Sequence, residues 1–402
     1  MRFRARFVLP IASPPIRDGW VSIDNGVITA VGRDRERSAD SERDLGSVAL
    51  LPGLVNAHTH LELAYLRDEV PPASEFVTWI RGVIGARRRL SDPNSPEILD
   101  GIARAMNEAV STGTVAVGDI SNTLVTFPLL AASPLAAVVF YELLRFNAPD
   151  GDETVREAVA RIRALPPSPR VRASLAAHAP YSVAPAIFRA LGRAMRADPD
   201  LRPCSVHLSE SAAEVEFIAT GDGPWRRLLE DLGVWDPQWT APGISPVQYV
   251  EEHQFLNDQV LAVHGVQMTR GDLSRLAASG ATLVTCPRSN GHTGAGAPPI
   301  EAFYASGVRV AVGTDSLAST PDLNLFFELA TMRALAPAVP ASALLDSATR
   351  QGARALGLDR ELGSLEAGRR GPVLAVEVPA SVDDVEEYLV SGITADQVTW
   401  IS

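Results

Sequence analysis

Residues 52–60, Pro52-Gly53-Leu54-Val55-Asn56-Ala57-His58-Thr59-His60, decide the fold of this chain. An apolar, strand-like run leads directly into two histidines that are two positions apart. Side chains at positions i and i+2 of a strand point to the same face, so the two imidazoles should lie side by side. Paired imidazoles are natural ligands for Zn²⁺. A His-x-His pair alone is more often two surface or capping histidines. A metal site therefore has to be supported by residues elsewhere in the chain.

Seven further apolar runs follow at intervals, with helix-like stretches such as 102–110 and 155–165 between them. This alternation predicts parallel strands joined by helices. Eight such runs in an α/β chain of 402 residues predict a (β/α)₈ TIM barrel with a small accessory domain. The expected strands span 50–57, 114–119, 136–143, 171–177, 205–208, 260–263, 281–285 and 308–313.

Polar side chains stand where several of these runs end. Five of the seven histidines do so, and so does an aspartate in Gly313-Thr314-Asp315-Ser316. The carboxyl ends of all barrel strands meet at one face, which is where barrel enzymes place their active sites. We therefore expect a metal ion to be bound by four groups: His58, His60, His207 and Asp315.

Two more strand-end residues are candidates for catalysis beside Asp315. Glu210 lies three residues past His207 and could shuttle protons without binding the metal. Its alternative is a solvated glutamate at the start of a helix. His264 could polarise an oxygen of the substrate or of the attacking water. Its alternative is a core histidine bonded to a backbone carbonyl.

The expected substrate contacts are less specific. His178 follows the fourth run and is assigned to the substrate because four metal ligands are already in place. Glu62 could bond a ribose hydroxyl or cap a turn. Arginines could receive a carboxylate, and aromatic rings could stack on the substrate. The residues chosen for substrate binding are His178, Glu62, Arg145, Arg288 and Tyr181. His253 is expected to have no role, and that of His292 stays open.

Composition excludes several classes of function. A formal net charge of −12 makes nucleic acid and anionic membranes poor partners. The chain contains no lysine, which excludes Schiff-base chemistry, a P-loop and a carboxylated lysine that bridges two metals. The only two cysteines, Cys204 and Cys286, indicate a reducing compartment. With no signal peptide or long apolar span in the sequence, we expect a cytoplasmic protein.

The two ends of the chain are expected to form one small β-sandwich domain from residues 1–50 and 362–402, around a barrel domain of residues 51–361. Asp24-Asn25-Gly26 is a hairpin signal within the first part. Residues 221–252 form a longer insertion with Trp225, Trp235 and Trp239. We expect it to cover the barrel mouth with short helices.

The motifs at 52–60, 207–210 and 313–316 resemble the amidohydrolase superfamily, in the order and spacing of its nucleoside deaminase and chlorohydrolase branch. His178-Ala179-Pro180-Tyr181-Ser182 and Cys286-Pro287-Arg288-Ser289-Asn290 are similar to aminofutalosine deaminase-like members. This resemblance implies one catalytic divalent metal ion. Zn²⁺ is the expected ion, with Fe²⁺ and Mn²⁺ as alternatives.

The function expected from these features is hydrolytic deamination of an aminopurine nucleoside similar to aminofutalosine, with release of ammonia. Glu210 would protonate a ring nitrogen, His264 would hold the oxygen, and Asp315 would carry protons from water to the leaving ammonia. The alternatives are hydrolysis of a ring chloride, a cyclic amide or a guanidino group at the same site, or a metal-binding scaffold without activity. The partner is a small molecule, and the oligomeric state, including a homodimer, stays open.

Overall fold

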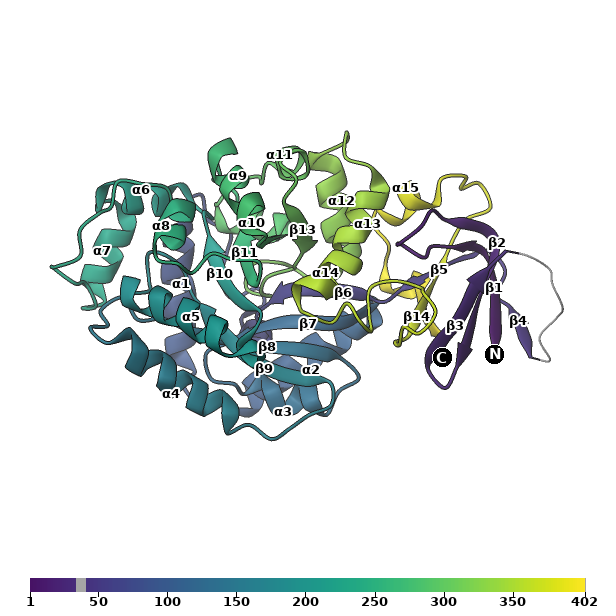
Figure 1. Cartoon of the computed structure of the whole chain (residues 1–402), viewed down its shortest axis with the longest axis horizontal. Coiled ribbons are helices and arrows are strands. Elements are labelled where there is room, and N and C mark those ends of the chain that lie inside the picture. The colour runs from purple at the N-terminus through teal and green to yellow at the C-terminus, as the bar shows by residue number, and fades with distance from the viewer. Residues whose placement is uncertain (34–40, 402) are drawn as a thin grey trace.

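The computed structural model describes residues 1–33 and 41–401, and its centre is a sheet of eight parallel strands (Figure 1). Neighbouring strands pair in chain order from β6 to β13, and the last meets the first through a parallel bridge between Thr59 and Asp315. The strands are β6 (Leu54–Thr59), β7 (Thr114–Ser121), β8 (Ala136–Leu143), β9 (Val171–Ala177), β10 (Cys204–Leu208), β11 (Val260–His264), β12 (Thr282–Thr285) and β13 (Arg309–Val312). The predicted (β/α)₈ barrel is confirmed.

Helices surround this barrel and connect its strands (Figure 1). Those before β10 are α1 (Phe76–Arg89), α2 (Pro96–Ser111), α3 (Thr126–Ala131), α4 (Gly151–Arg163) and α5 (Pro185–Ala197), with 3-10 turns η1 (Leu61–Leu66) and η2 (Pro199–Leu201). Those after β10 are α6 (Ala212–Thr220), α7 (Pro224–Asp231), α8 (Pro246–Glu252), α9 (Arg270–Ser279), α10 (Pro287–Thr293), α11 (Ile300–Ala305), α12 (Leu325–Leu335), α13 (Ala341–Ser347) and α14 (Arg350–Ala355). Helix α15 (Val385–Leu389) and η3 (Ala395–Gln397) instead connect β14 to β15 in the sheet of the chain ends. The helical spacing at 102–110 and 155–165 thus corresponds to α2 and α4.

Both ends of the chain contribute to one seven-stranded sheet beside the barrel. Its strands are β1 (Arg2–Val8), β2 (Ile16–Asp24), β3 (Val27–Gly32), β4 (Glu42–Asp44), β5 (Val48–Pro52), β14 (Val373–Glu377) and β15 (Val398–Ile401). The predicted hairpin joins β2 to β3, and Asn25 and Gly26 have the positive φ angles, 49° and 73°, that its tight turn requires. The small β domain made from the two chain ends is therefore present.

The prediction of a single strand over 50–57 is wrong. Leu50 and Leu51 pair with β14 in the sheet of the chain ends, whereas Leu54 begins the first barrel strand. The break falls at Gly53, where a Cβ atom would lie only 2.7 Å from the Cβ of Val115. Because glycine has no Cβ atom, the chain can pass close to Val115 as it moves from one sheet to the next. An unbroken apolar run in the sequence does not reveal that it spans two sheets.

The insertion at 221–252 forms α7 and α8 and packs through its aromatic rings. Trp239 stacks on Phe217 with ring centroids 4.8 Å apart, and Trp235 stacks on Phe146 at 5.6 Å. These contacts hold the insertion against the barrel, as its tryptophans indicated.

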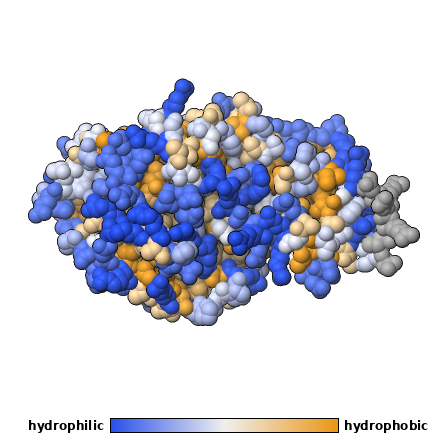
Figure 2. Space-filling model, viewed as in Figure 1, coloured by the Kyte–Doolittle hydropathy of each residue, from blue (hydrophilic) through white to orange (hydrophobic). Residues whose placement is uncertain are grey.

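The surface in Figure 2 is mainly hydrophilic, with small apolar areas between. Among the described residues, the large hydrophobic side chains that are exposed include Leu144 and Val234. Within 1–33 and 41–401, no helix is long and apolar enough to cross a membrane.

The side chain of Asn56 stabilises the barrel where β6 meets β13. It is fully buried, its Nδ2 donates to the hydroxyl of Thr314 at 2.8 Å, and its Oδ1 accepts from the backbone N–H of Thr314 at 3.1 Å. We predict that Asn56→Ala lowers the free energy of unfolding by about 2–3 kcal/mol, because the partners are left buried and unsatisfied. Urea unfolding of metal-free protein checks this, with the exposed Asn94→Ala as control. A loss below about 0.5 kcal/mol would contradict it.

Candidate metal centre and active site

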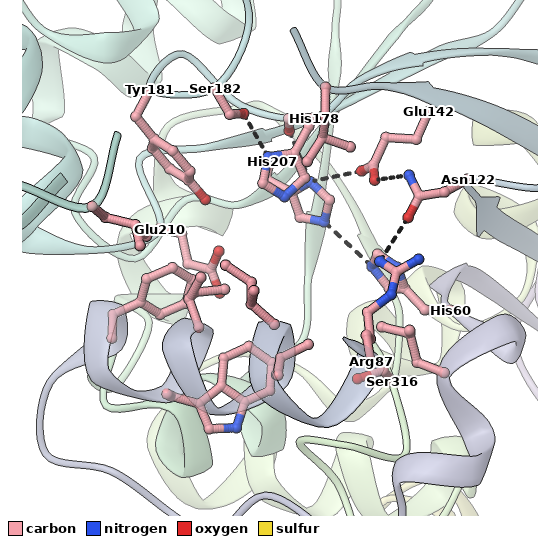
Figure 3. A pocket seen from close by; sticks show the side chains of 18 of the residues that line it. His60, Arg87, Asn122, Glu142, His178, Tyr181, Ser182, His207, Glu210 and Ser316 are labelled. Atoms are coloured by element: carbon pink, nitrogen blue, oxygen red, sulfur yellow. Dashed lines mark hydrogen bonds and ion pairs between the residues drawn. The ribbon is translucent and has the colours of Figure 1, made fainter. Parts of the chain in front are cut away.

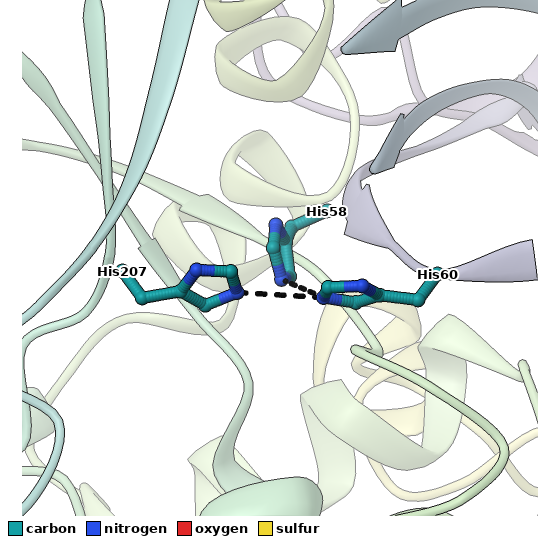
Figure 4. A group of neighbouring side chains, drawn as sticks. All are labelled: His58, His60 and His207. Atoms are coloured by element: carbon teal, nitrogen blue, oxygen red, sulfur yellow. Dashed lines mark hydrogen bonds between the residues drawn. The ribbon is translucent and has the colours of Figure 1, made fainter. Parts of the chain in front are cut away.

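Three histidines and one aspartate converge at the carboxyl-terminal end of the barrel strands (Figure 4 shows the histidines). The Nε2 of His60 lies 3.2 Å from the Nε2 of His58 and 3.4 Å from the Nε2 of His207. The Oδ1 of Asp315 lies 3.2 Å from the Nε2 of His60 and 3.6 Å from that of His58. The four residues chosen from the sequence as metal ligands thus point their ligand atoms at one another.

The chemistry of these groups fits a divalent metal ion. The Nδ1 of His207 lies 2.8 Å from the carbonyl oxygen of His178, so Nδ1 donates its hydrogen and Nε2 presents a lone pair. Burial and then the neighbouring histidines hold the pKa of His207 well below its usual value, which keeps the ring neutral. Lone pairs that face one another in a buried site are best satisfied by a shared cation, and three nitrogens with one carboxylate suit zinc.

Asp315 is held with one oxygen toward the histidines. Its Oδ2 accepts hydrogen bonds from the hydroxyls of Ser289, at 2.6 Å, and Ser319, at 3.3 Å. Burial would raise the pKa of Asp315, but hydrogen bonds with His58 and His60 outweigh it and hold that pKa well below its usual value. Both conditions favour an anionic ligand. Ser289 belongs to the Cys-Pro-Arg-Ser-Asn motif, and its contact with Asp315 was not predicted.

Glu210 and His264 form a second, buried pair beside this centre. The Nε2 of His264 lies 3.5 Å from an oxygen of Glu210. Burial raises the pKa of Glu210 well above its usual value, and the charges of Asp315 and Glu214 raise it further. Burial also lowers the pKa of His264 to about 3. Burial therefore favours the protonated form of Glu210 and the neutral form of His264.

Hydrogen bonds to neighbouring residues fix the orientation of this pair. The Nδ2 of Asn290 lies 3.0 Å from the Nδ1 of His264, so Nδ1 accepts and the ring hydrogen is on Nε2, toward Glu210. The carboxylate of Glu214 accepts the backbone N–H groups of Ser209 and Glu210, each at 2.8 Å. Glu214 thereby holds the turn that presents Glu210.

Three turns at this rim have strained backbones. The φ angles of Ser209, His264 and Asp315 are 53°, 78° and 61°. These values lie in the left-handed region, which residues other than glycine rarely adopt. Each follows or ends a barrel strand and turns the chain sharply there. Such conformations persist where the surrounding structure enforces them, and they are common at active sites.

These groups lie at one side of a cavity that has a largely apolar lining (Figure 3). Helices α1 and α7 supply most of the apolar wall, and Leu144 lies at its edge. Tyr181 stacks on Trp225 with ring centroids 3.6 Å apart. The apolar wall includes Leu63, Phe76, Trp79, Ile80, Val83, Ile84, Leu144, Trp225, Leu228, Leu229 and Leu232.

Of the five expected substrate contacts, His178 and Tyr181 line this cavity and three residues do not. Glu62 is buried behind it and accepts hydrogen bonds from the backbone N–H groups of Asn122 and Thr123, so it caps a turn, as its alternative stated. Arg145 lines a neighbouring pocket and donates to Thr154.

Arg288 is paired through both of its terminal nitrogens with Asp322, at 2.8 Å each. Its guanidinium is thus occupied by a carboxylate of the protein. The Nε2 of His292, in α10, lies 3.1 Å from the carbonyl oxygen of Val70, in the loop after η1. His253, which was expected to have no role, is half-buried near Arg189, away from the cavity.

Five polar residues of the cavity were not among the predicted site residues: Arg87, Asn122, Glu142, Ser182 and Ser316, of which the two serines lie in motifs that the sequence had singled out. Glu142 lies in β8, near the carboxyl end of the third strand, so the strand-end rule that selected the histidines could have found it. Asn122 directly follows β7 and satisfies the same rule. Arg87 lies in α1 within Arg87-Arg88-Arg89, where nothing in the sequence singles it out.

Comparisons with known proteins agree with this geometry. The model of the amidohydrolase family matches residues 49–392. An aminodeoxyfutalosine deaminase from Deinococcus radiodurans is 30% identical over 84% of this chain and 81% of its own length. A 5-methylthioadenosine/S-adenosylhomocysteine deaminase from Syntrophobacter fumaroxidans is 31% identical over 89% and 80%. The structure of an adenosine deaminase from Xanthomonas campestris with bound zinc is 28% identical, with a TM-score of 0.80 over 99% of this chain and 90% of that one.

We predict that the chain binds about one equivalent of a divalent metal ion, and that His60→Ala or His207→Ala lowers this content severalfold. Each substitution removes one of four ligands and opens the site. Elemental analysis after dialysis measures the content, with His253→Ala, which lies outside the site, as control. Two tightly bound ions per chain, or full content in both ligand variants, would contradict the assignment.

Proposed function

This chain belongs to the amidohydrolase family, and we propose that it deaminates an aminopurine nucleoside with an aromatic, carboxylate-bearing 5′ substituent. The observation behind this proposal is the contact of the buried Glu210 with His264, 3.5 Å apart, beside the candidate metal ligands, where burial raises the pKa of Glu210 and lowers that of His264. Deamination of a purine requires one group that gives a proton to the ring and another that binds the new oxygen.

The candidate ligands would hold one divalent ion, and we propose Zn²⁺. When bound there, such an ion supplies Lewis acidity that makes water a nucleophile near neutral pH. Asp315, with its lowered pKa and one oxygen free of the serines, would accept a proton from the attacking water. It would later deliver that proton to the leaving amino group, so that water is consumed and ammonia is released.

Glu210 and His264 would act on the substrate itself. Glu210 would donate its proton to a ring nitrogen next to the amino-bearing carbon, as expected of an acid with a raised pKa. It would regain a proton from the hydroxyl formed on that carbon as the carbonyl forms and ammonia leaves. The Nε2–H of His264 would donate a hydrogen bond to the oxygen that forms on that carbon. Asn290 supports this role, because it accounts for the hydrogen on Nε2.

The cavity lining supports a nucleoside with a large 5′ group. Phe76, Trp79 and Trp225 offer aromatic surface for a second ring. Arg87 is the one arginine among the described residues of the lining. It contacts Glu62 through one nitrogen and Asn122 through another, whereas Arg288 is bound to Asp322 through two, so Arg87 keeps N–H groups for a carboxylate of the substrate and replaces Arg145 and Arg288 as the candidate for that contact. The names of the Deinococcus and Syntrophobacter relatives support deamination of 5′-substituted adenosines.

A substrate panel tests this proposal. We predict that zinc-loaded enzyme releases ammonia from adenosine, methylthioadenosine and a 5′-aryl-carboxylate analogue of adenosine, with the highest kcat/KM for the analogue. A chlorotriazine, a cyclic amide and a guanidino compound serve as the alternative substrates, with chloride and ammonia both measured. If kcat/KM were higher for plain adenosine than for the analogue, the proposed 5′ specificity would be wrong. If kcat/KM were higher for the chlorotriazine than for every nucleoside, the proposed deamination would be wrong.

We predict that Glu210→Gln lowers kcat by about 10²–10⁴-fold, because the amide has nearly the same shape but cannot transfer the proton. Metal content should stay at the wild-type level, which elemental analysis of the same sample checks. Glu216→Gln, on the exposed face of α6, is the matched control and should turn over normally. If Glu210→Gln turned over at the wild-type rate, a group other than Glu210 would have to transfer the proton, and this prediction would be wrong.

A further inference from the structure

We propose that Glu142 determines specificity by accepting a hydrogen bond from a sugar hydroxyl of the substrate, an inference that rests on the proposed nucleoside deaminase function. Glu142 lines the cavity and is only 6% exposed. Its Oε2 accepts from the Nδ2 of Asn122 at 2.8 Å, whereas its Oε1 accepts no hydrogen bond and has the Nδ1 of His207 nearby, at 3.7 Å (Figure 3). A buried carboxylate oxygen without a donor is costly, so the site fits a ligand that brings one.

The metal-binding histidine beside Glu142 does not satisfy this oxygen. The Nδ1 of His207 lies 3.7 Å from Oε1, but it lies 2.8 Å from the carbonyl oxygen of His178 and donates there. Glu142, His178 and His207 also bring ligand-type atoms within 4.8 Å of one another. The Nδ1 of His207 already donates to the carbonyl oxygen of His178. A second metal ion could therefore bind His207 only through Nε2, the nitrogen that faces the first metal site.

A chain of polar contacts holds Glu142 in this orientation. Arg87 donates to the Oδ1 of Asn122 at 2.9 Å, which turns the Nδ2 of that amide toward Glu142. Arg87 also pairs with Glu62 at 3.2 Å. Glu62 therefore positions Glu142 indirectly, through Arg87 and Asn122. The Asn122 side chain is held by Arg87 at its oxygen and by Glu142 at its nitrogen.

The charges around Glu142 favour a neutral donor. A cationic ligand group would lie near the Arg87 guanidinium and the metal centre, whereas a hydroxyl can donate to the carboxylate without that repulsion. The lining has an acid–base part, a hydrogen-bonding part and an aromatic part. A nucleoside with an aromatic 5′ group has a base, a sugar with hydroxyls and a second ring to match them.

The test compares kcat/KM for the best nucleoside of the panel with that of its 2′-deoxy and 3′-deoxy forms. We predict that the wild type prefers the ribonucleoside by about 10- to 100-fold over at least one of them, as expected for a hydrogen bond to a charged group. In Glu142→Ala this ratio should fall to within about threefold. Glu142→Gln, which keeps the size and the fold, should give an intermediate ratio.

Glu157→Gln, on α4 in the neighbouring pocket, is the matched control and should keep the wild-type ratio. A preference that persists in both Glu142 variants, or a wild type indifferent to both hydroxyls, would overturn this inference and leave the deaminase function standing. Loss of metal from Glu142→Gln would assign the residue to the metal site and also overturn it. A wild type that deaminates no nucleoside would overturn the proposed function first.

Discussion

The carbonyl oxygen of His58 accepts the backbone N–H groups of both Thr314 and Asp315, where the last barrel strand meets the first. This contact brings residues more than 250 positions apart in the sequence to the same point, and Gly313 permits it, because a Cβ there would lie 2.7 Å from that oxygen. The metal centre depends on this closure, since it places the Asp315 carboxylate against His58 and His60. The barrel and the site are thus stabilised by the same hydrogen bonds.

Burial then differentiates the polar groups that the barrel gathers. The same desolvation acts on Glu210, His264 and Asp315, but their neighbours differ. Contacts with two imidazoles lower the pKa of Asp315, whereas burial and the nearby carboxylates raise the pKa of Glu210. Two carboxyl groups a few residues past their strands can therefore take opposite roles, one as ligand and base and the other as acid.

Much of this could be predicted from the sequence, because strand ends in a parallel barrel share one face. That rule found His58, His60, His207, Glu210, His264 and Asp315, which the structure brings together. The rule does not predict which side chains bond to other protein groups instead of facing the cavity. Arg288 is paired with Asp322, and Glu62 caps a turn, so neither lines the cavity. Contacts from helices, such as that of Arg87 with Asn122, depend on tertiary packing that no local pattern encodes. The passage of the chain between two sheets at Gly53 was missed for the same reason.

The central claim is that three imidazoles and one carboxylate form a single metal centre, and X-ray absorption at the zinc edge of zinc-loaded enzyme tests it most directly. The account predicts three nitrogen neighbours at about 2.0–2.1 Å and oxygen neighbours at about 2.0–2.2 Å. A sulfur neighbour at about 2.3 Å would contradict it, because the four proposed ligands include no cysteine, although the buried Cys286 lies against the backbone of Asp315. A second metal at about 3.5–4 Å would contradict it as well.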